Sequence, residues 1–144
     1  MMAFIGNLIK TTSDRLRRAN IIDSKSDAIR LISHALKIRR VDLILNSERN
    51  FVYSEPDVLE EYIRRRVARE PVAKIVGEKN FWNSSFVVNS NVLDPRPETE
   101  ILVNQVLEVA LPNFRILDLG TGSGCIAISI ALELSNCSVI GSDI

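Results

Sequence analysis

Apolar residues over the first 70 positions recur roughly every three to four residues, the spacing that places them on one face of a helix. This periodicity predicts a first helix over residues 4–19 and a second that begins near Ser24 or Ser26, where a serine can cap the first turn. A short third helix is expected over residues 41–45, ahead of a polar, turn-like stretch.

The fourth predicted helix has the clearest start signal. Ser54 is followed three residues later by Asp57, which resembles a capping box, and Pro56 suits the first helical turn. The apolar spacing continues until shortly before Pro71. Four short helices with short connections predict a small helical bundle over residues 1–70.

The pattern changes after this bundle. Over residues 72–92 the apolar side chains are mostly β-branched or aromatic, and Gly77 and Asn83 interrupt them. Strand-forming residues separated by turn-forming ones predict a β-hairpin, and we assign residues 71–95 to a hairpin linker. Prolines mark the next boundary, and acidic residues in a first turn then predict a helix over residues 98–110.

Residues 96–144 are predicted to begin a third part of a different kind. An apolar strand is expected over residues 114–119, a glycine-rich loop over 120–124, a helix over 125–134 and a second strand over 138–141. This is the βαβ plan of a doubly wound sheet, in which ligands lie at the carboxyl ends of the strands.

The glycine-rich loop is a candidate binding site. Glycines permit positive φ angles and allow a ligand to approach the backbone closely. Asp143 lies 23 positions after Gly120, where an acidic residue can accept hydrogen bonds from both hydroxyls of a ribose. The motif therefore lies in the strand–loop–helix context that a nucleoside-containing ligand requires.

Three ligands compete for such a loop. A triphosphate-binding loop would have lysine and then serine or threonine where this chain has Ser123 and Gly124, and a dinucleotide loop would have glycine in place of Cys125. Asp118 precedes the first glycine, and its carboxylate would repel a pyrophosphate but not a cationic sulfonium. S-adenosyl-L-methionine is the ligand that satisfies all of these conditions.

Charge and cysteine content limit the class of protein and the cellular compartment that we expect. The chain has 18 basic and 18 acidic residues, but residues 1–70 carry a net charge of +4 and residues 71–144 a net charge of −4. We interpret the basic excess as solvated helix faces rather than a nucleic-acid site. Two cysteines without paired-ligand spacing argue against a disulfide scaffold and a zinc site, and an apolar start that is soon interrupted by charge argues against a membrane helix. We expect a cytoplasmic monomer.

Several motifs are more specific than the glycine loop. They are Pro71-Val72-Ala73, Gly77, Phe81-Trp82, the run VLDPRPETE over residues 92–100, and the run ILDLGTGSGCIA over residues 116–127. With these motifs the chain resembles, almost from end to end, the release factor glutamine methyltransferases of the HemK or PrmC family. PRPETE ahead of DLGTGSG is the combination that distinguishes this family from other glycine-loop proteins.

The resemblance implies a fold of class α plus α/β. It has a small N-terminal helical bundle that recognises class I peptide chain release factors, a β-hairpin linker, and the start of a Rossmann-like class I methyltransferase domain. That domain methylates the side-chain amide nitrogen of the Gly-Gly-Gln glutamine with S-adenosyl-L-methionine. By resemblance, residues 96–99 shape the cofactor and substrate side of the cleft. The implied cofactor-binding residues are Gly120, Thr121, Gly122, Ser123, Gly124 and Asp143.

The resemblance also bears on catalysis. The family's catalytic Asn-Pro-Pro-Tyr segment is not among residues 1–144, so we expect it beyond Ile144 and expect the 144-residue chain alone to be inactive. Two alternatives remain open. One is a related N-methyltransferase acting on a ribosomal protein glutamine or a nucleic-acid base, and the other is a non-catalytic module that docks onto translation factors.

Other polar residues are expected to have structural roles. His34, the only histidine, lies beside an apolar helix stripe, which favours a half-buried structural residue. Trp82 is expected to anchor the hairpin in the core. The run Arg64-Arg65-Arg66, with Arg69 close by, is expected to form a solvated helix face and is also the best candidate in the sequence for contact with a partner.

Overall fold

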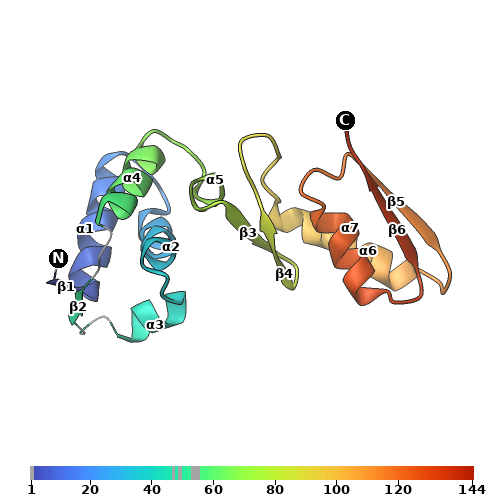
Figure 1. Cartoon of the computed structure of the whole chain (residues 1–144), viewed down its shortest axis with the longest axis horizontal. Coiled ribbons are helices and arrows are strands. Elements are labelled where there is room, and N and C mark those ends of the chain that lie inside the picture. The colour runs from blue at the N-terminus through green and yellow to red at the C-terminus, as the bar shows by residue number, and fades with distance from the viewer. Residues whose placement is uncertain (1, 47, 49, 53–55) are drawn as a thin grey trace. The chain divides into compact units, whose positions relative to one another are not determined.

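The computed structural model describes residues 2–46, 48, 50–52 and 56–144. The chain forms two compact units that divide between Val76 and Gly77 (Figure 1). Each unit has its own apolar core.

The first unit is helical. It contains α1 (Ile5–Arg18), α2 (Ser24–Leu36), α3 (Arg40–Leu45), α4 (Pro56–Val67) and α5 (Val72–Val76). The first four are the helices that the apolar periodicity predicts. The predicted capping box at Ser54 lies outside the described residues. Two short strands that the pattern did not predict, β1 (Met2–Phe4) and β2 (Asn50–Val52), pair antiparallel.

The core of this unit forms where α1, α2, α3 and α4 turn their apolar faces inward. Leu16, Leu31, Ile32 and Leu43 are fully buried, and Ile63 is nearly so. Each buried side chain of this size contributes roughly 1.5–3 kcal/mol relative to an exposed one. The helical stripe therefore both defines the helices and supplies the packing that holds them together.

Residues 72–76 form α5 rather than part of the predicted hairpin. The prediction was wrong here because it weighed β-branched composition above spacing. Val72 and Ile75 are three positions apart, as on one helix face, and both are buried in the core of the first unit. Gly77 follows with a φ of +82°, a left-handed conformation that ends the helix.

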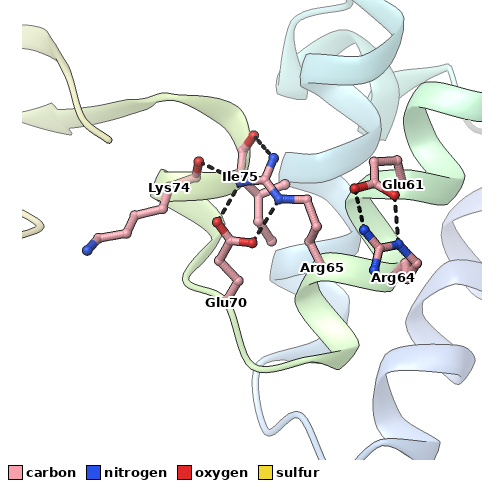
Figure 2. Close-up of polar contacts among 6 residues, drawn as sticks. All are labelled: Glu61, Arg64, Arg65, Glu70, Lys74 and Ile75. Atoms are coloured by element: carbon pink, nitrogen blue, oxygen red, sulfur yellow. Dashed lines mark hydrogen bonds and ion pairs between the residues drawn. The ribbon is translucent and has the colours of Figure 1, made fainter. Parts of the chain in front are cut away.

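Arg65 holds α5 against α4 (Figure 2). Its guanidinium donates to both carboxylate oxygens of Glu70, at 2.8 and 2.5 Å. It also donates to the backbone carbonyl oxygens of Lys74 and Ile75, each at 3.2 Å. Arg65 thus satisfies carbonyl groups at the end of α5 that have no partner within that short helix.

Two further arginines join α4 and the residues after it to other helices. Arg66 Nε donates to Asp27 Oδ2 on α2 at 2.7 Å, and both side chains are largely buried. Arg69 donates to the carbonyl oxygens of Ala19 and Asn20, just after α1. The expectation of a solvated arginine face is therefore wrong for Arg65 and Arg66, because both side chains are partly buried and donate to carboxylate and carbonyl oxygens of the protein.

Arg64 differs from its neighbours. It pairs with Glu61 through two hydrogen bonds of 2.7 Å one turn away on the same exposed helix face (Figure 2). Elsewhere on this helix, Tyr62 places its hydroxyl 3.0 Å from Nδ1 of His34. Both rings are partly buried, so the predicted structural role of the histidine is confirmed.

The second unit begins with the predicted hairpin. Strands β3 (Glu78–Phe81) and β4 (Ser84–Val87) pair antiparallel, and Trp82 and Asn83 form the two-residue turn between them. The turn is anchored by polar contacts. The backbone N–H of Trp82 donates to Glu100 Oε1 at 2.8 Å, and its indole Nε1–H donates to Glu133 Oε1 at 2.7 Å.

The rest of the second unit has the predicted order of elements. A short 3-10 helix, η1 (Pro97–Thr99), leads into α6 (Glu100–Val109), and β5 (Arg115–Leu119), α7 (Cys125–Glu133) and β6 (Ser138–Ser142) follow. Strands β5 and β6 are parallel, with Arg115 opposite Ser138 and Leu119 opposite Ser142. The hairpin contributes Phe81 and Phe86 to the buried core of this unit. The other buried core residues are Val103, Cys125 and Ile130. The three-part division at residues 70 and 95 stays a prediction.

None of the helices in the described part of the chain combines the length and apolarity that crossing a membrane requires. Both cysteines are free, and Cys125 is buried.

Candidate functional site

The glycine loop lies at the carboxyl ends of the two parallel strands. Backbone N–H groups of Gly120 and Thr121 both donate to the carbonyl oxygen of Ser142, at 2.8 and 3.0 Å. These bonds fix the start of the loop to the end of β6, which is the edge where a doubly wound sheet binds its ligands.

Three glycines of the loop have left-handed backbone conformations. Their φ angles are +74° at Gly120, +55° at Gly122 and +77° at Gly124. A Cβ atom built on Gly120 or Gly122 would meet no atom within 4 Å, so open space lies beside the backbone there. The loop thus offers both the conformation and the room that a closely approaching ligand needs.

The Asp118 carboxylate stabilises the loop by accepting two hydrogen bonds. Its Oδ2 accepts a hydrogen bond from the Thr121 hydroxyl at 2.8 Å and another from the backbone N–H of Ala127 in the first turn of α7 at 3.2 Å. The sequence indicated only an electrostatic role for this carboxylate. In the structure it also links the end of β5 to the glycine loop and to the first turn of α7.

Asp143 reaches the loop from the end of β6. Its Oδ2 accepts the Gly122 N–H at 2.5 Å, and its Oδ1 accepts the Ile144 N–H at 2.8 Å. These two backbone donors, Ile144 first and Gly122 second, hold the pKa of the Asp143 carboxyl below its usual range. The side chain is exposed and ionised at neutral pH, so each oxygen keeps a lone pair with which to accept a hydroxyl.

Ser123 adds an unpartnered polar atom. Its Oγ is buried and has no hydrogen-bond partner among the described residues. Buried polar groups are normally paired, so a hydroxyl of this kind within a glycine loop favours a polar ligand atom as its partner. The structure therefore brings together all six residues predicted to bind the cofactor, from Gly120 to Gly124 and Asp143.

Gly141 is a site residue that the sequence analysis missed. A Cβ on this β6 residue would lie 2.8 Å from Thr121 Oγ1 and 3.2 Å from both Thr121 Cβ and Cγ2. Thr121 can therefore pack across the strand only because residue 141 has no side chain. A glycine within a predicted strand is the signal that could have revealed this close approach.

Residues 96–99 occupy a different place. They lead into α6, with residues 96–98 exposed and Thr99 partly buried, and the Thr99 N–H donates to the carbonyl oxygen of Arg96 at 3.0 Å. Among the described residues, no hydrogen bond or ion pair joins this segment to the glycine loop. Its expected role in shaping the cleft stays a prediction.

Fold and site together define a chain in which a helical unit precedes a Rossmann-like unit with a loop suited to a nucleoside-containing cofactor. The family model described as the PrmC N-terminal domain matches residues 7–77. A release factor glutamine methyltransferase of Buchnera aphidicola subsp. Schizaphis graminum is 46% identical over 114 residues, which cover 78% of this chain and 42% of that protein.

Two other relatives of the same name match nearly the whole chain. The protein of Leptospira interrogans is 41% identical over 95% of this chain and 49% of its own length. That of Nitratidesulfovibrio vulgaris is 37% identical over 98% of this chain and 48% of its own length. The chain belongs to the release factor glutamine methyltransferase family, and it spans about half the length of the curated relatives it matches.

Proposed function

We propose that this chain is part of an S-adenosyl-L-methionine-dependent enzyme that methylates the Gly-Gly-Gln glutamine of class I peptide chain release factors on its side-chain nitrogen. The observation that carries the proposal is the junction of the Gly120–Gly124 loop with Asp143 at the carboxyl edge of β5 and β6. The names of the relatives support the substrate class.

Each residue of the site has a role in this proposal. Asp143 accepts the two ribose hydroxyls, which its ionised carboxylate is free to do while it holds the Gly122 N–H. The open backbone at Gly120 and Gly122 lies against the methionyl part, and the buried Ser123 hydroxyl takes a polar atom of the ligand. Asp118 keeps negative potential beneath the loop, which favours a sulfonium over a pyrophosphate.

When bound, S-adenosyl-L-methionine supplies an electrophilic methyl group. An amide nitrogen is a poor nucleophile because its lone pair is delocalised into the carbonyl, so the acceptor must be held in line with that methyl. The residues of this chain bind and orient the donor side of the reaction. We assign no catalytic residue within residues 1–144.

Cofactor binding tests the proposal directly. Calorimetric titration of S-adenosyl-L-methionine into the chain should show binding, and Asp143→Ala should weaken it about tenfold or more because two charge-assisted hydrogen bonds are lost. Asp23→Ala is the matched control, since Asp23 is exposed and makes no side-chain cap to α2. Equal affinity of wild type and Asp143→Ala would contradict the assigned role of this carboxylate.

The substrate class is tested by binding. A class I release factor should bind the chain in the presence of S-adenosyl-L-methionine, whereas a control protein without a Gly-Gly-Gln loop should not. Preference for a ribosomal protein or for a nucleic acid would instead support a related N-methyltransferase.

A further inference from the structure

A groove on the first unit lies among α1, α2 and α3. It consists of two adjoining hollows of about 410 and 730 Å³, which share Lys25, Ile29 and Ile44. All three helices belong to one compact unit, so the groove is formed within that unit.

The floor of the groove is aliphatic. Ile9 from α1 and Ile29 from α2 lie between the helices, while Val41 and Ile44 from α3 are 61% and 58% exposed. Isolated exposed apolar residues are ordinary, but apolar residues that line a common hollow are typical of a binding surface. A partner that covered α3 would remove these two side chains from water.

The rim of the groove is basic. Lys10, Lys25 and Arg40 are exposed, and none of them forms an ion pair within the described part of the chain. The only acidic side chain among the described residues that line it is Asp14, which already pairs with Arg17 at 2.9 Å. The groove therefore presents unpaired positive charge around an apolar floor.

We propose that this groove docks an acidic segment of the substrate protein that carries aliphatic side chains on one face. The identity of that substrate, a class I release factor, rests on the proposed function. Carboxylates of the segment pair with Lys10, Lys25 and Arg40, and its aliphatic face covers Val41 and Ile44. These contacts are made by the first unit, whereas the glycine loop belongs to the second.

A nucleic acid fits this surface less well. Single-stranded nucleic acids bind grooves in which aromatic side chains stack on the bases, and the described residues that line both hollows include no aromatic residue. An aliphatic floor with a few cations at its edge is suited to a protein segment.

Charge reversal provides the test. The variant Lys25→Glu with Arg40→Glu should weaken calorimetric binding of the release factor about tenfold or more at low salt, because like charges then face each other across the interface. The control is Arg18→Glu with Lys37→Glu, which changes the net charge equally at exposed positions outside both hollows and should leave affinity unchanged. Ile44→Ser tests the floor without adding charge and should also weaken binding.

Each outcome is decisive. If the wild-type chain binds release factor and both groove variants bind equally well, the groove is not the docking site, while the proposed function stands. If the wild-type chain does not bind release factor, both the partner and the docking proposal fail. Binding of an RNA oligonucleotide that only Lys25→Glu with Arg40→Glu abolishes, with release factor binding unchanged, would overturn the proposal in favour of a nucleic-acid surface. Circular dichroism should show unchanged helix content in all variants.

Discussion

The geometry of the glycine loop depends on the absence of a side chain at Gly141. The space that a methyl group would need is occupied by the Thr121 side chain, whose Oγ1 lies 2.8 Å from the position of that methyl. The Thr121 hydroxyl in turn donates to Asp118, so the Thr121 side chain cannot move without breaking this hydrogen bond.

We therefore predict that Gly141→Ala destabilises the second unit by about 1–3 kcal/mol, the usual cost of overpacking, and weakens binding of S-adenosyl-L-methionine. Thermal unfolding and calorimetric titration measure the two effects. Ser138→Ala on the same strand is the control, because it adds no atoms to the structure. Unchanged stability and affinity in Gly141→Ala would show that Thr121 relaxes without cost.

At the residue scale, the shape of the glycine loop and its contact with Asp143 were largely predictable, because the loop is one short motif and Asp143 follows the next strand. The loop glycines and Asp143 follow from local sequence and from the parallel pairing of two strands. The contact between Gly141 and Thr121 was not predictable in the same way. It depends on how a threonine side chain packs over a neighbouring strand, which residue spacing does not encode.

At the scale of the element, α4 presents three consecutive arginines with three different environments. Arg64 lies on an exposed face with Glu61, Arg65 caps α5, and the largely buried Arg66 pairs with Asp27 of α2. Consecutive residues on a helix point in directions about 100° apart, so one charged run reaches both solvent and neighbouring helices.

Removal of Arg66 should therefore be far more harmful than removal of Arg64. Arg66→Ala leaves the buried Asp27 carboxylate without its partner, and we predict a loss of about 3 kcal/mol in the free energy of unfolding. Arg64→Ala should change stability little, since water replaces an exposed pair. Chemical denaturation distinguishes the two, and equal effects would refute the difference in environment.

The pair between Arg65 and Glu70 makes stability depend on pH. The Arg65 hydrogen bonds hold the pKa of Glu70 below its usual range, so the unfolded chain binds the proton more readily than the folded one. The stabilising contribution is thus complete at neutral pH. It is lost as pH falls below the unfolded value of about 4.3 towards the lower folded value.

Glu70→Gln should consequently lower stability at pH 7 by about 1 kcal/mol or less, because the pair is partly exposed and screened. The difference from wild type should vanish at the acid end of a series of denaturation curves. A difference that persisted unchanged at low pH would show that the carboxylate charge is not responsible.

Element types were predictable wherever apolar spacing and composition agreed, as in α1, α2, β5 and α7. They were not predictable over α5, where β-branched composition favours a strand and burial in the first core imposes a helix. Strands β1 and β2 also escaped prediction, because they are short and pair with each other across most of the first unit's sequence.

At the scale of the whole molecule, the two units differ in how completely they enclose their apolar residues. The first buries a core contributed by α1, α2, α3, α4 and α5. In the second, Leu117 and Leu119 of β5 are 57% and 75% exposed, and parallel strands are usually covered on both faces.

We predict that a fragment of residues 1–76 folds cooperatively and keeps the thermal midpoint of the first unit in the whole chain. The physical reason is that its core includes no residue from beyond Val76. Circular dichroism of the fragment, compared with a fragment of residues 77–144, measures this. A fragment that is unfolded at low temperature would contradict the independence of the first unit.

Trp82 can serve as a fluorescent probe of the second unit. It is the only tryptophan of the chain, it lies in the second unit, and its indole donates to the Glu133 carboxylate on α7. Fluorescence excited in the indole band therefore reports on the hairpin and its contact with α7, while the far-ultraviolet signal comes largely from the helices of the first unit. The protein carries its own optical label, with which the melting of its two halves can be followed separately in one sample.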